Sequence, residues 1–160
     1  MTASLAERVH ETLLARGETV ATAESLTAGL VGAALTTTPG SSATYRGGLI
    51  VYATDLKASL AGVPAGLLAA RGAVDPDVAA ALAAGVRERL GAGWGLGLTG
   101  VAGPDSQDGM PVGTLFVAVA DGIEQPTVSR SVLTGDRGAV RLSAVDVALT
   151  LFLDRLVDAS

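Results

Sequence analysis

The sequence has no cysteine, one histidine and one lysine, and these shortages exclude or disfavour whole classes of chemistry. Without cysteine the chain has no disulfide, no thiolate nucleophile and no cysteine-based metal site. The histidine, His10, falls in the first predicted helix, where we interpret it as a solvent-facing residue. A Ser-His-Asp triad or a histidine-rich zinc site would have to use it, so both are disfavoured.

Basic clusters and long apolar runs are also absent. The formal net charge is −5 with no run of basic residues, which argues against nucleic acid as a partner. No apolar run reaches the roughly 18 residues of a membrane span. Residues 1–16 indicate an amphipathic helix without the apolar core of a signal peptide. We therefore expect residues 1–160 to form one cytoplasmic domain that binds neither nucleic acid nor a membrane.

Hydrophobic periodicity predicts alternating helices and strands. Helices are expected at 5–16, 24–36, from 55 through Lys57, 64–70, 75–90 and 139–157, and strands at 19–23, 49–53, 94–98, 112–120 and 127–133. Ser25 is the expected N-cap of the second helix, and residues 105–110 are expected to form a polar, mobile loop. The alternation predicts a layered α/β domain, and the consecutive strands at 112–133 predict a mixed sheet.

The lysine is a candidate general base. Ten of the 11 basic residues are arginine, and only Lys57 can lose its proton near neutral pH, because a guanidinium stays protonated. Burial or a neighbouring cation would lower its pKa toward the working range. The alternative is an ordinary surface lysine. Tyr52 lies five residues earlier, where it can stack on a flat ring or hydrogen-bond the catalytic pair.

A base needs a nucleophile, and the serines in turns are the candidates. Ser42 follows Gly40 in a turn where nearby N–H groups can face an oxyanion, so it is a candidate for this role. Ser41 and Ser25 are competitors. The commoner role of such a turn is local hydrogen bonding between side chain and backbone, so the tripeptide alone is a weak signal.

Three further segments have features of phosphate-binding loops: a helix start, a glycine-flanked turn after a strand, and two arginines one helical turn apart. The residues assigned to substrate binding are Thr27, Ser41, Thr99, Gly100, Gly103, Arg137 and Arg141. Capping, turn geometry and a solvated helix face are the structural alternatives. Together with the serines, these segments predict a site for a small phosphorylated molecule.

Seven blocks of sequence resemble the CinA C-terminal domain family, which includes stand-alone nicotinamide mononucleotide deamidases. In chain order they are TAESLTAGL, PGSSATYRGGLIVYATDLK, GVP, GAVDPDV, LTGVAGP, PVGTLFVAVA and TGDRGAVR. They extend from residue 22 to residue 141, so the resemblance covers most of the chain. The larger N-terminal domain of longer CinA proteins has no counterpart among these blocks, and we expect none of its activities.

The resemblance implies a three-layer α/β/α domain with a mixed, mostly parallel sheet, assembled as a homo-oligomer. It implies hydrolysis of nicotinamide mononucleotide to nicotinate mononucleotide and ammonia, without metal or organic cofactor. Ser42 is expected to attack the carboxamide while neutral Lys57 takes its proton. Ser25 and Tyr52 are expected to position the amide or polarise that pair, and Arg137 to hold the phosphate or ribose.

Two departures from the family pattern leave alternatives open. The usual AESCTGG reads here as AESLTAG, with Leu26 and Ala28 at the cysteine and first glycine positions. The methyl group of Ala28 falls where the backbone is expected to approach a ligand. A nucleotide-binding or regulatory module without catalysis, and an amidase for a different carboxamide, are therefore the competing hypotheses.

Overall fold

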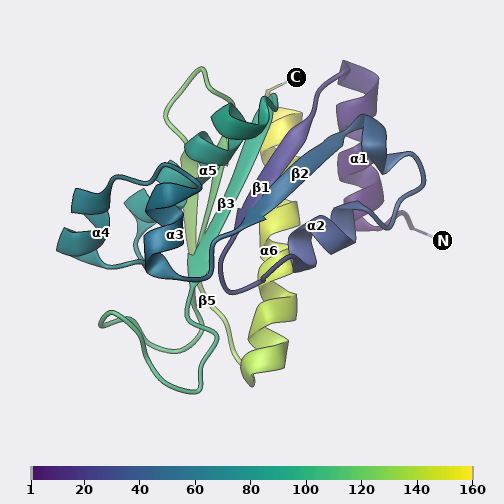
Figure 1. Cartoon of the computed structure of the whole chain (residues 1–160). Helices are drawn as coiled ribbons and strands as arrows, with labels where there is room; N and C mark the ends of the chain where they lie inside the picture. The colour runs from purple at the N-terminus through teal and green to yellow at the C-terminus, as the bar shows by residue number, and fades with distance from the viewer. Residues whose placement is uncertain (1, 160) are drawn as a thin grey trace.

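The computed structural model describes residues 2–159, which form a five-stranded sheet between two layers of helices (Figure 1). The helices are α1 (Leu5–Arg16), α2 (Leu30–Leu35), α3 (Thr54–Ser59), α4 (Ala65–Arg71), α5 (Pro76–Leu90) and α6 (Arg137–Asp158). The strands are β1 (Val20–Glu24), β2 (Tyr45–Ile50), β3 (Trp94–Gly100), β4 (Thr114–Ala120) and β5 (Thr127–Val132). A 3₁₀ turn, η1 (Ser41–Ala43), precedes β2. The expected α/β/α fold is confirmed.

The strands follow the order β2-β1-β3-β4-β5. The central strand β1 runs parallel to β2 and to β3, whereas β4 is antiparallel to both of its neighbours. The sheet is therefore mixed, as expected, with four strands pointing the same way. The carboxyl ends of β1, β2 and β3 meet at one edge of the sheet, which is where open α/β sheets usually place their ligands.

Local signals in the sequence set the long helices. Ser4 and Glu7 form a reciprocal capping box at the start of α1, and Gly17 ends that helix in a left-handed conformation. Asp75 caps α5 by accepting a hydrogen bond from the N–H of Asp77. Pro76 occupies the first position of α5, where a backbone N–H would have no partner within the helix, so proline costs no hydrogen bond there. The helix begins where the sequence predicts.

Two apolar layers enclose the sheet. One face packs against α1, α2 and α6, where Trp94 and Phe152 meet edge to face with their ring centroids 5.7 Å apart. On the opposite face, α5 lies directly against β3, and a Cβ atom at Gly95 would overlap the carbonyl oxygen of Ala83. This contact requires glycine at that position in the strand. No helix among residues 2–159 combines the length and apolar character needed to cross a membrane.

Two elements differ from the sequence-based expectation. The predicted helix at 24–36 is shorter, because Glu24 completes β1 and residues 25–29 form a turn before α2 begins at Leu30. Ser25 is consequently not an N-cap. Strand β2 begins at Tyr45, four residues earlier than expected. The glycines at positions 47 and 48 are weak strand formers, so the sequence pattern does not predict that they pair with β1.

Candidate active site

The one lysine of the chain points at a serine. The Nζ atom of Lys57, on α3, lies 3.0 Å from the Oγ atom of Ser25, which follows β1 directly. The same nitrogen donates to the carbonyl oxygens of Val51 at 2.8 Å and Tyr52 at 3.2 Å. Three acceptors therefore match the three protons of an ammonium group.

Burial makes this lysine unusual. Lys57 is only 1% exposed, and burial lowers the pKa of its ammonium group to about 8, with the carboxylate of Asp108 acting in the opposite direction. When the proton facing Ser25 is lost, two N–H bonds remain for the two carbonyl oxygens, and the lone pair faces the serine hydroxyl. The geometry of the contact is thus suited to a neutral amine that accepts a proton.

The strand-turn-helix connection after β1 places Ser25 at the sheet edge. The buried carboxylate of Glu24, at the last position of β1, accepts hydrogen bonds from the N–H groups of Gly29, Val31 and Gly32. Because these donors lie at the start of α2, the carboxylate satisfies helix N–H groups that would otherwise have no partner. The turn that carries Ser25 is fixed on one side as a result.

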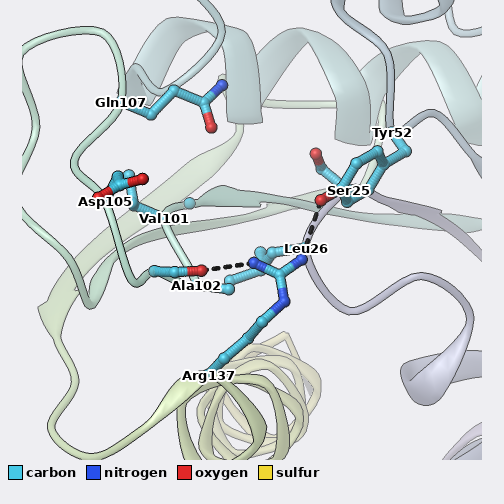
Figure 2. Close-up of a pocket in the computed structure, with 10 residues that line it drawn as sticks. Ser25, Leu26, Tyr52, Val101, Ala102, Asp105, Gln107 and Arg137 are labelled. Carbon is cyan, nitrogen blue, oxygen red and sulfur yellow. Dashed lines mark hydrogen bonds between the residues drawn. The ribbon is translucent and has the colours of Figure 1, made fainter.

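A pocket of about 130 Å³ opens beside Ser25 (Figure 2). It lies between the end of β1, the segment after β2, the loop after β3 and the start of α6. Its lining residues are Ser25, Leu26, Tyr52, Gly100, Val101, Ala102, Gly103, Asp105, Gln107 and Arg137. Four expected site residues therefore meet here besides Ser25 itself, and they are Tyr52, Gly100, Gly103 and Arg137.

Arg137 crosses the mouth of this pocket. Its guanidinium donates to the carbonyl oxygen of Gly103 at 2.6 Å and to the hydroxyl of Tyr52 at 3.0 Å, the two dashed lines of Figure 2. These contacts use two of the five N–H donors of the guanidinium, and three remain for an anionic ligand. Tyr52 is 58% exposed, so its ring is accessible from solvent.

Arg141, one turn further along α6, does not line the pocket. Its Nε atom donates to the carbonyl oxygen of Leu26, 2.9 Å away, and this contact holds the turn after Ser25 from the side of α6. The expectation that Arg137 and Arg141 together clamp a phosphate is therefore not met by the geometry. Instead, each arginine binds a carbonyl group of a different pocket loop.

The predicted pairing of Ser42 with Lys57 is wrong. Ser42 belongs to η1, which precedes β2, whereas Lys57 belongs to α3, which follows it. Six residues of extended strand span about 20 Å, so the two side chains lie at opposite edges of the sheet. Ser41, expected to bind substrate, lies in η1 with Ser42, and its carbonyl oxygen accepts the hydroxyl of Thr44.

Two predicted binding threonines are buried away from the pocket lining. The hydroxyl of Thr99 donates to the carbonyl oxygen of Ala73, 2.7 Å away, and thereby ties β3 to the segment before α5. Thr27 is fully buried, and its hydroxyl has no hydrogen-bond partner among the described residues. His10, expected to face solvent, is buried and makes a 2.8 Å hydrogen bond to Thr44 that joins α1 to η1.

Sequence reasoning missed two polar residues of the pocket, Asp105 and Gln107, because segment 105–110 was expected to be mobile. The segment is anchored instead. Gln107 pairs with Met110 in an isolated bridge, and Asp108 accepts a hydrogen bond from the N–H of Ala73 at 2.9 Å. The Asp-Gly pair at 108 and 109, typical of tight turns, was the available signal for this structure.

Comparison with protein families gives a match to the CinA C-terminal domain over residues 2–156. The chain belongs to the CinA C-terminal domain family. A CinA-like protein of Frankia casuarinae is 56% identical over 142 residues, which are 87% of this chain and 32% of that protein. A CinA-like protein of Gemmatimonas aurantiaca is 48% identical over 135 residues, or 84% of this chain and 31% of that protein. The chain thus spans about a third of the length of these CinA relatives.

Solved CinA structures share the whole fold. The crystal structure of a CinA superfamily protein from Klebsiella pneumoniae 700603 superposes with a TM-score of 0.92 at 32% identity, covering 96% of each chain. The competence/damage inducible protein CihA from Agrobacterium tumefaciens gives a TM-score of 0.90 at 33% identity, covering 95% of this chain and 93% of the other.

Proposed function

We propose that this CinA domain is an amidohydrolase that converts nicotinamide mononucleotide and water to nicotinate mononucleotide and ammonia. The observation that carries the proposal is the 3.0 Å contact between Ser25 Oγ and the buried Nζ of Lys57 at the wall of a pocket. A serine hydroxyl is a weak nucleophile alone and becomes effective beside a base whose pKa lies near the working pH. Ser25 and Lys57 provide that combination without histidine or metal.

In the proposed reaction, Ser25 Oγ attacks the carboxamide carbon while its proton moves to the neutral Nζ of Lys57. A tetrahedral intermediate forms with negative charge on the former carbonyl oxygen. Lys57 then gives the proton to the departing nitrogen, the carbon–nitrogen bond breaks, and ammonia leaves an acyl-serine ester. A water molecule, deprotonated by the again neutral Lys57, hydrolyses the ester and restores Ser25.

The polarity of the pocket supports a pyridine nucleotide as substrate. Nicotinamide mononucleotide carries a cationic pyridinium ring and an anionic phosphate, and the pocket is lined by one carboxylate, Asp105, and one guanidinium, Arg137. Its volume of about 130 Å³ is close to the roughly 150 Å³ of a cavity that holds one benzene ring. The proposal therefore places the ring inside, with Tyr52 against it, and the phosphate at the rim with Arg137.

An ammonia-release screen tests this function. Purified protein is incubated separately with nicotinamide mononucleotide, nicotinamide riboside, free nicotinamide and NAD, and ammonia is measured by a coupled assay. We expect the mononucleotide to give the highest kcat/KM and the riboside, which lacks the phosphate, to lose affinity. Ammonia from another carboxamide alone would establish a different amidase. Tight binding of the nucleotide without ammonia would establish a binding module.

A further inference from the structure

The first two turns of α6 hold both loops that flank the pocket. Arg141 donates from Nε to the carbonyl oxygen of Leu26, in the turn after β1, and Arg137 donates to the carbonyl oxygen of Gly103, in the loop after β3. The two arginines are four residues apart on one helix and share a face. The helix therefore fixes the distance between the nucleophile turn and the opposite loop.

Both loops carry N–H groups that the fold leaves unused. Among the hydrogen bonds of residues 2–159, none has the N–H of Leu26 or of Ala102 as donor, although both residues line the pocket. The neighbouring N–H of Val101, in contrast, is bound to the carbonyl oxygen of Thr114 at 2.9 Å. Unpaired backbone N–H groups beside a nucleophile are the usual donors to the oxygen that becomes negative during acyl transfer.

We infer that Arg141 is a positioning residue, which holds the Leu26 peptide so that the Leu26 N–H serves as one donor of an oxyanion hole, with the Ala102 N–H as the second. The inference rests on the proposed function, because it takes Ser25 as the nucleophile. The Leu26 carbonyl that Arg141 binds belongs to the 26–27 peptide, which is joined through the Cα atom of Leu26 to the 25–26 peptide that carries the donor. Rotation of the first peptide therefore changes the orientation of the second and misaligns the Leu26 N–H.

Alignment of an oxyanion donor and binding of the substrate phosphate have different effects on kcat and KM. A residue that binds the substrate phosphate acts in the ground state and in the transition state, so its loss raises KM. A residue that aligns an oxyanion donor acts on charge that develops only in the transition state, so its loss lowers kcat at nearly constant KM. Arg141 does not line the pocket, and we expect the second pattern.

Three substitutions separate the hydrogen bond from the charge. Arg141→Gln keeps an N–H donor at the position of Nε but removes the charge, whereas Arg141→Lys keeps the charge with a methylene group at that position. Arg141→Met has a similar length and neither property. Loss of an oxyanion donor costs about a hundredfold or more in kcat, and its misalignment here is expected to cost Arg141→Met and Arg141→Lys about 10- to 100-fold. Arg141→Gln should retain kcat within about threefold.

The rate of covalent labelling by a fluorophosphonate gives a readout that does not depend on the substrate. Each variant and the control Leu142→Ala, an exposed neighbour on α6, is labelled and the modified residue is identified by mass spectrometry. We expect Ser25 to be labelled at the wild-type rate in Leu142→Ala and Arg141→Gln and more slowly in Arg141→Met. Equal labelling of Arg141→Met, or rescue by Lys and not by Gln, would overturn the role of Arg141 alone. Failure of the wild type to label at Ser25 would overturn the nucleophile as well.

Discussion

Ser25 and Ser42 lie at opposite edges of one sheet, although each is next to a strand of the same parallel pair. Ser25 follows the carboxyl end of β1, and Ser42 precedes the amino end of β2. Lys57 follows β2 and therefore meets Ser25. The parallel direction of two neighbouring strands thus decides which serine lies beside Lys57.

Substitution of the two serines distinguishes them as nucleophiles. Ser25→Ala removes the hydroxyl that Lys57 contacts, and we expect turnover of nicotinamide mononucleotide to fall by more than about a thousandfold. Ser42→Ala changes an exposed residue far from the pocket, and its kcat should stay within about twofold of the wild type. Ammonia release under single-turnover conditions measures both. The assignment would be reversed by an active Ser25→Ala protein beside an inactive, folded Ser42→Ala protein.

The pH dependence of turnover reports the protonation of Lys57. Because the base must be neutral and burial lowers its pKa to about 8, kcat/KM should rise about tenfold per pH unit below this value and level off above it. The profile is measured between pH 5.5 and pH 10 by ammonia release, with circular dichroism at each pH to confirm folding. A profile that is flat from pH 6 to pH 9 would argue against a lysine base.

The same buried amine makes stability depend on pH. The pKa of Lys57 is lowered from 10.5 to about 8 by folding, so between these values the unfolded chain binds more protons than the folded one. Stability therefore increases as the pH rises through this window, by roughly 3 kcal/mol in total, since one pKa unit corresponds to about 1.4 kcal/mol. Below pH 8 the cost of burying the charge is present in full.

Urea unfolding at pH 7.5, 9 and 10.5 tests this linkage against a matched variant. Lys57→Met is unbranched, one atom shorter than lysine, and cannot titrate. The difference in unfolding free energy between the wild type and the variant should therefore shift in favour of the wild type as the pH rises. Other titrating groups are common to both proteins and cancel. A difference that stays constant over the three pH values would mean that Lys57 is not depressed in the folded state.

Much of the fold follows from local signals in the sequence. The capped helices α1 and α5 have the bounds that Gly17 and Pro76 predict, and the buried strands β3 and β4 are recognisable as apolar runs. The segment after β1 was harder to predict. Its polar start is typical of a helix N-terminus, yet Glu24 is buried at the end of a strand and reaches forward to the N–H groups of α2. The burial of Glu24 depends on the pairing of β1 with β2 and β3, which no local pattern shows.

The sequence predicts which types of residue form the candidate site, but it does not predict which of these residues contact one another. Elimination predicts Lys57 as the candidate base, because a guanidinium stays protonated, and the structure shows this lysine buried and in contact with a serine. The choice between Ser25 and Ser42 required the order and direction of the strands, which local patterns do not determine. The arginine pair on α6 was correctly placed on one helix face, but which groups it binds depends on loops far away in the sequence.

A substitution at Ala28 tests the backbone strain of the nucleophile turn. Ala28 has a positive φ of 46°, where a side chain costs about 1–2 kcal/mol. Glycine removes that strain but adds roughly 0.5–1 kcal/mol of unfolded-state entropy, so Ala28→Gly should raise the free energy of unfolding by about 0.5–1 kcal/mol. Ala33→Gly, at an exposed helical position of α2, should lower it by a similar amount. The midpoint of urea unfolding at constant m-value measures both.

Equal losses of stability in the two variants would contradict the strain at Ala28. Because Ala28 is exposed and lies outside the pocket lining, the kcat of Ala28→Gly should stay within about twofold of the wild type.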